Sequence, residues 1–151
     1  MSNFDSAQAL ALFQAIQSMA QQTGLFQGEV IIHDPWNAPG SRINCSISLG
    51  AVRPVPSSGL ASVSGQITLI VRVWSSLLQI PQDNVDPEVL AAACTLMGQF
   101  AGGFTLGGTV RDIDLFGMSA VPSYVEIEGK EYRSVEITLP IVINDMFAEA
   151  A

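Results

Sequence analysis

The chain has 151 residues, of which 48% are hydrophobic and 13% are charged. A chain of this length and apolar content can bury a core, so the composition excludes intrinsic disorder and predicts one domain over residues 1–151. The 14 acidic residues outnumber the 6 basic ones, for a formal net charge of −8. Because phosphate binding needs clustered cations and these are scattered, we expect no specific binding of nucleic acid.

Membrane and secretory classes are also disfavoured by the sequence. No window approaches 18 uncharged apolar residues, so we expect no membrane-spanning segment. The opening residues carry neither a basic run nor an apolar stretch, so we expect no signal peptide. Cys45 and Cys94 are therefore interpreted as reduced thiols in a cytosolic product.

The first predicted element is a helix that begins after Asp5 or Ser6 and runs to about Thr23. Gly24 is its natural stop. Apolar residues recur at helical spacing and predict one buried stripe: Ala9, Leu12, Phe13, Ile16, Met19 and Ala20.

Strands and loops alternate over the next fifty residues. Residues 29–33 are predicted as a short strand, 43–49 as a half-buried strand with period-two alternation, and 63–73 as a third strand. The segments 34–42 and 52–61 each hold two prolines and at least one glycine, so both are predicted loops.

A second helix is predicted from the sequence Asp86-Pro87-Glu88 to Gly102-Gly103. Asp86 is expected to cap it, Pro87 suits the first helical position, and Glu88 suits the positive end of the helix dipole. Its expected buried stripe is Val89, Leu90, Ala93, Met97, Phe100 and Ala101.

The remainder is predicted to be sheet. Residues 110–116 and 125–128 alternate, Gly129-Lys130 is a predicted hairpin turn, and 132–143 form the longest strand. Pro140 cannot donate to a sheet ladder, so this strand is expected at an edge or to be bulged there. The element order predicts an α+β fold, with a mostly antiparallel sheet and two main helices packed on one face.

Catalytic and metal sites find little support. His33 is the only histidine, and no nucleophile-elbow sequence is present. The glycine-rich segment 102–109 follows a helix and lacks the Lys-Ser/Thr of a phosphate loop, so it is interpreted as a connector. We therefore expect no enzyme activity and no cofactor. Four carboxylates remain open to two interpretations, a cation site or a solvated polar face: Asp112, Asp114, Glu126 and Glu128.

Other residues are candidates for contacts with protein partners. Trp36 lies among turn residues, and tryptophan is enriched at interface centres; packing onto its own core is the alternative. Arg53 belongs to the proline-rich loop, which is long for a compact domain. Tyr132 and Arg133 begin the predicted edge strand.

Laid out in this way, the chain resembles the tail terminator (tail completion) proteins of long-tailed bacteriophages. The likeness covers roughly half of the chain. It is carried by these strings: Val71-Arg72-Val73-Trp74, Pro81-Gln82-Asp83, Asp86-Pro87, residues 104–111 (FTLGGTVR) and residues 136–145 (EITLPIVIND).

The resemblance implies a structural virion protein that forms a ring, typically a hexamer, on the growing end of the tail tube. Such a ring ends tube polymerisation and provides the docking surface for the head. The implied partners are further copies of the chain, the tail tube protein and a head–tail connector or neck protein. The implied location is the head-proximal end of the tail, after assembly in the host bacterial cytoplasm. No catalytic residues come with the family.

DNA passes through such a ring, so a lumen that repels phosphate is expected, and Asp112, Asp114, Glu126 and Glu128 are the candidate acidic lumen face. Other assignments remain open. The chain is alternatively another tail or neck component or a tail tube subunit, or, more distantly, a non-enzymatic ligand-binding or adaptor module.

Overall fold

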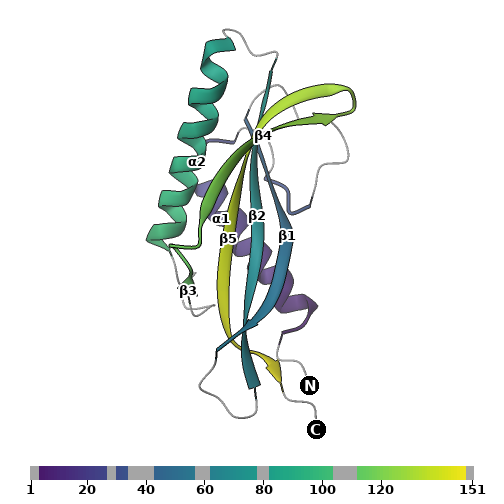
Figure 1. Ribbon diagram of the computed structural model, residues 1–151, viewed down its shortest axis with the longest axis vertical. Helices are drawn as coiled ribbons and strands as arrows, with labels where there is room; N and C mark the ends of the chain where they lie inside the picture. The colour runs from purple at the N-terminus through teal and green to yellow at the C-terminus, as the bar shows by residue number, and fades with distance from the viewer. Residues whose placement is uncertain are drawn as a thin grey trace.

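The computed structural model describes residues 4–26, 30–33, 43–56, 62–77, 82–103 and 112–148. Two helices and five strands follow one another along these residues (Figure 1). In chain order they are α1 (Ser6–Gln22), β1 (Asn44–Val55), β2 (Ser62–Ser76), a single 3-10 turn (Gln82–Asn84), α2 (Val85–Gly102), β3 (Asp112–Ile113), β4 (Ser119–Ile127) and β5 (Lys130–Ala148).

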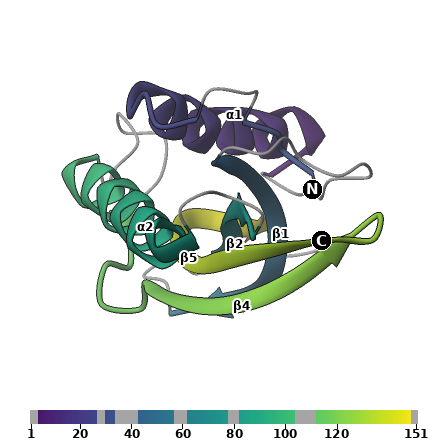
Figure 2. The ribbon, with the colours of Figure 1, turned by 90° about the horizontal axis from the view of Figure 1, so that it is seen from above.

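The strands form one antiparallel sheet in the order β1-β2-β5-β3, and β4 pairs with β5 on the same side as β3. Both helices lie on one side of this sheet (Figure 2), and their buried residues share one core with it. The predicted α+β class, with a mostly antiparallel sheet and helices on one face, is confirmed.

The core is built from alternate residues of the three long strands, because successive side chains in a strand point to opposite faces. Along β2 the buried set is Ile67, Leu69, Val71 and Val73, and along β5 it is Val135, Ile137, Leu139 and Ile141. Helix α1 covers them with Leu12, Ile16 and Ala20, and α2 with Val89, Ala92, Ala93, Leu96 and Phe100.

Helix α1 begins and ends as its sequence predicts. The carboxylate of Asp5 accepts a hydrogen bond from the Gln8 amide at 2.9 Å, and the Gln8 side chain accepts one from the Asp5 amide at 3.0 Å. This reciprocal pair is a capping box, which satisfies amides at the start of a helix. Gly24, at φ 70°, follows the last turn.

Helix α2 starts slightly earlier than predicted. The 3-10 turn leads into Val85, and Asn84 is the N-cap residue, with no capping hydrogen bond from its side chain. Asp86 therefore lies in the first helical turn and is not the cap. Its carboxylate bonds instead to Arg133 on β5.

Strand β5 is central in the sheet, which corrects the predicted edge strand at 132–143. It pairs with β2 on one side and with β3 and β4 on the other. The carbonyl of Pro140 accepts a hydrogen bond from the Asp114 amide, at the turn between β3 and β4. The amide and carbonyl of a residue in an antiparallel ladder point to the same neighbour. The nitrogen of Pro140, which has no hydrogen to donate, therefore points towards the turn between β3 and β4, where no strand residue needs that hydrogen bond.

Three predictions about short segments also differ from the structure. The predicted strand at 29–33 appears in its described part only as an isolated parallel bridge between Ile31 and Ser46. In the described part of the predicted strand at 110–116, only β3 is strand, and a turn begins at Leu115. The β4–β5 turn is Glu128-Gly129, one residue earlier than predicted, with φ values of 53° and 76°.

Candidate functional site

The three predicted contact residues that the structure describes do not form a single site. Trp36 lies outside the described residues. Arg53 lies on β1, which extends into the segment predicted as a loop, and its guanidinium donates to the Gln66 side chain at 3.0 Å. Arg53 remains exposed and is therefore available to a partner.

Tyr132 is buried, which corrects its assignment as a contact residue. Only 2% of it is exposed, and its ring meets Trp74 edge-on with centroids 6.3 Å apart. Burial, followed by the nearby Glu128 carboxylate, raises the pKa of the Tyr132 phenol above its usual value. The side chain is part of the subunit's interior and presents nothing to a neighbour.

Arg133 joins α2 to the β4–β5 hairpin. Its Nε donates to Asp86 Oδ1 at 2.9 Å, and its guanidinium lies 4.3 Å from the centroid of the Tyr124 ring. Its side chain is 17% exposed, whereas that of Asp86 is 68% exposed. Arg133 therefore acts first as a bridge within the subunit, at the rim of a groove described below.

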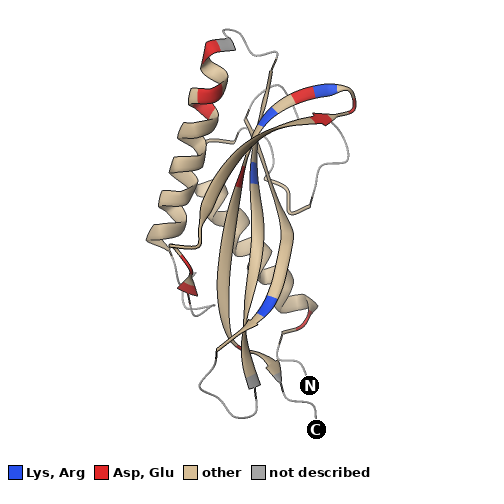
Figure 3. Ribbon diagram, in the orientation of Figure 1, with Lys and Arg blue, Asp and Glu red and all other residues tan. Residues whose placement is uncertain are grey.

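The four carboxylates of the candidate lumen face are not brought together. Asp112 pairs with Val142 of β5, and Glu126 pairs with Glu131. These positions on β5 are 142 − 131 = 11 residues apart, or roughly 36 Å at the rise of a strand. Figure 3 shows the two acidic places at opposite ends of the sheet. The four carboxylates therefore do not form a single cation site among the described residues, and their place on a lumen remains a prediction.

Two margins of the sheet are open along the described chain. Strand β1 has β2 on one side, and on the other meets only Ile31, opposite Ser46. Strand β4 has β5 on one side, and no other described strand pairs with it. An open margin presents backbone donors and acceptors that another chain can pair with.

Large apolar side chains are exposed near these margins. On β1 they are Leu49 and Val52, at 59% and 46%, and on β4 they are Val121 and Tyr124, at 58% and 69%. Phe116, in the turn before β4, is fully exposed. Val121 and Tyr124 were not predicted to lie on a strand, because this region was expected to be a strand only from residue 125.

An apolar groove lies between α2 and β4. It encloses about 440 Å³. Its lining on α2 includes Leu90, Ala93 and Met97, and on β4 Ala120 and Pro122. Arg133 and Asp86 stand at its rim. Sequence reasoning missed this groove because it forms between elements whose contact was not predicted.

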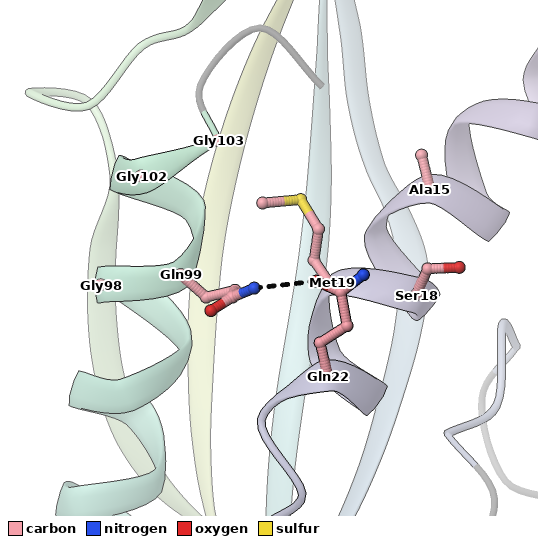
Figure 4. A pocket seen from close by; sticks show the side chains of 8 residues that line it. All are labelled: Ala15, Ser18, Met19, Gln22, Gly98, Gln99, Gly102 and Gly103. Carbon is pink, nitrogen blue, oxygen red and sulfur yellow. Dashed lines mark hydrogen bonds between the residues drawn. The ribbon is translucent and has the colours of Figure 1, made fainter. Parts of the chain in front are cut away.

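A second hollow of about 470 Å³ separates α1 from α2. Figure 4 shows Met19 of α1 and Gln99 of α2 projecting into the gap, where Gln99 donates to the Gln22 side chain at 3.1 Å. Gly98, Gly102 and Gly103 leave the α2 wall with few side-chain atoms.

Among the described residues, the side chains that could act in catalysis or bind a metal do not lie together in one site. No group of three His, Cys, Asp or Glu side chains there is placed to hold a metal ion. Burial raises the pKa of the Cys45 thiol to about 12, so this thiol stays protonated at neutral pH. Cys94 and His33 are both exposed. No helix within the described ranges is both long and apolar enough to span a membrane.

No protein-family model matches the chain, and no curated protein matches it.

Proposed function

We propose that the chain is a virion assembly protein of the tail terminator type. It forms a ring, about hexameric, that caps the tail tube, ends polymerisation and offers the docking surface for the neck. The observation that carries the proposal is the pair of open sheet margins, β1 and β4, bordered by exposed apolar side chains.

A ring requires a heterologous contact, in which one patch meets a different patch on the next subunit. The β1 margin and the β4 margin are two such patches, because they lie on opposite sides of the sheet. Pairing between them would satisfy backbone groups of both strands, as in other cases of strand addition. It would also cover Val52 of one subunit and Val121 of the next.

The charge distribution is compatible with DNA passing through the ring. The net charge of each subunit is −8, and like charge repels phosphate. Because the acidic residues form two separated groups, we propose two acidic belts, one from Asp112 and Asp114 and the other from Glu126 and Glu128. This replaces the single acidic face expected from the sequence.

Native mass by light scattering after gel filtration, over a range of concentrations, tests the ring. We expect a closed species near six times the 16.0 kDa subunit mass, with a central hole in negative-stain images. Val52→Lys on β1 should shift this species to monomer, since it places a charge on the margin. Leu10→Lys, at a similarly exposed site on α1, is the matched control and should leave the ring intact.

A monomer in solution requires a second measurement, because some rings close only on their tube. Tail tubes are then added, and bound protein is located by electron microscopy with gold labelling. Labelling confined to tube tips supports the terminator. Growth into filaments would favour a tube subunit, and a monomer that ignores tubes would exclude the proposal.

A further inference from the structure

The groove between α2 and β4 has the size and lining of a docking site. Its volume of about 440 Å³ falls within the range of roughly 300–1,000 Å³ found for ligand pockets. Along α2, Leu90, Cys94 and Met97 recur at helical spacing on the side that borders the groove, and none of them is buried. Leu90 is 64% exposed, so covering it would remove apolar surface from water.

Acidic residues flank both ends of this apolar groove. Asp83, Asp86 and Glu88 lie at or before the first turn of α2, while Asp112 and Asp114 lie on and just after β3. Figure 3 shows these two red regions separated by uncharged stretches of α2 and β4.

The positive charge near the groove is limited. Arg133 is the one basic residue among the described residues of its lining, and it pairs with Asp86. Asp83, Asp86 and Glu88 together with Arg133 therefore have a formal charge of −2 at this end. At the far end, the described residues 112–114 include two aspartates. In the sequence Arg111 precedes them, so the stretch 111–114 has a formal charge of −1. The described surroundings therefore favour a cationic ligand.

We propose that the groove binds an amphipathic helical segment of a partner protein, with apolar side chains flanked by Lys or Arg. The apolar side chains would cover Leu90 and Met97, and the cations would meet the acids at each end. Charge counts against a second copy of this chain as the occupant. Each copy carries −8, and its exposed turn at Leu115 and Phe116 directly follows Asp114. The proposal goes beyond the ring and stands without it.

A designed pair of peptides tests the proposal. The first is a capped helix of about 14 residues, with Leu at the i, i+3, i+4 and i+7 positions that grooves recognise and Lys elsewhere. The second has Glu in place of every Lys. Binding is followed by NMR of the methionine methyl groups in the full chain. Met97 reports on the groove, and Met19, in the hollow between the helices, is an internal control.

The Lys peptide should shift the Met97 methyl signal and leave Met19 unchanged, while the Glu peptide should bind at least about tenfold more weakly. Leu90→Lys should weaken the Lys peptide by about tenfold, because it removes an apolar contact and adds a repelling charge. Thr95→Lys is the matched control, since it adds the same charge at an exposed position of α2 that does not line the groove. Its effect should be clearly smaller.

Three results would overturn the proposal. The first is equal binding of the two peptides, and the second is equal weakening by Leu90→Lys and Thr95→Lys. The third is a dimer, seen by light scattering at the NMR concentration, that Leu90→Lys dissociates and Thr95→Lys does not. That result would make a second copy the occupant. None of these results bears on the ring, which is tested separately by the native mass of the Val52→Lys variant and by binding to the tips of tail tubes.

Discussion

The rings of Trp74 and Tyr132 meet edge-on, at an interplanar angle of 87°. Both are about 2% exposed. The Trp74 indole also donates to the Ser46 hydroxyl at 3.1 Å, so β1, β2 and β5 are tied together on the sheet face opposite the helices. This contact explains why Tyr132 is structural although the sequence placed it at an interface.

Tyr132→Ala should lower the free energy of unfolding by about 3–5 kcal/mol, as expected for removing a buried aromatic side chain. Tyr124→Ala, on the exposed face of β4, should cost less than about 1 kcal/mol even though it removes the ring beneath Arg133. Urea denaturation followed by circular dichroism measures both. Similar costs for the two variants would contradict the packing role of Tyr132.

Two glycines should respond oppositely to alanine. A Cβ on Gly65 would overlap the Met146 sulfur and lie 2.9 Å from a Phe147 ring carbon, so Gly65→Ala should destabilise the protein by about 1–3 kcal/mol. A Cβ on Gly98 of α2 meets no atom within 4 Å, so Gly98→Ala should stabilise it by about 1 kcal/mol. Thermal unfolding of the two variants against the parent decides both signs. The register between β2 and β5 shifts next to Gly65, between Val63 and Gly65. A neutral Gly65→Ala would show that this irregularity adjusts freely.

The β4–β5 turn carries a strained residue. Glu128 has a φ of 53° and is followed by Gly129 at 76°, the pattern of a two-residue turn that favours Asn-Gly. Glu128→Asn should therefore raise the free energy of unfolding by about 1 kcal/mol. Glu128→Gln removes the same charge but keeps a side chain disfavoured at this φ, so it separates the conformational effect from the electrostatic one. Equal gains from both variants would assign the effect to charge alone.

Alkaline pH should destabilise the protein through Cys45. Its folded pKa of about 12 lies above the ordinary thiol value of 9.0 because the thiol is buried. The stabilisation is complete below pH 9 and is lost as the pH rises towards 12, at about 1.4 kcal/mol per pH unit. The raised pKa of Tyr132 acts in the same direction above pH 10. Cys45→Ala should flatten the dependence measured by urea denaturation between pH 8 and about 10.5.

Thiol titration gives an independent check of the same burial. In native protein at neutral pH, a disulfide reagent should modify the exposed Cys94 and leave the buried Cys45 intact. Both thiols should react in denaturant. Rapid native modification of Cys45, seen in Cys94→Ser protein, would mean that the core opens at β1.

The sequence by itself determined the local features. Helical periodicity located both helices, Asp5 or Ser6 as the expected cap placed the start of α1, and period-two alternation identified the strands that hold Ile47 and Ile137. These features depend on neighbours a few residues apart, which is why patterns in the chain report them. Together they were sufficient for the fold class.

Tertiary structure alone decided which strands became neighbours and therefore what is buried. Pro140 indicated an edge strand, yet β5 is central because the β3–β4 interruption accommodates the missing donor. Tyr132 is buried because Trp74 packs against its ring. Asp112 and Glu126 lie apart because they pair with distant positions of β5. The groove between α2 and β4 also depends on this arrangement. Which side chains are buried, and which residues far apart in the sequence are in contact, depends on the order of the strands in the sheet. No local sequence pattern encodes that order.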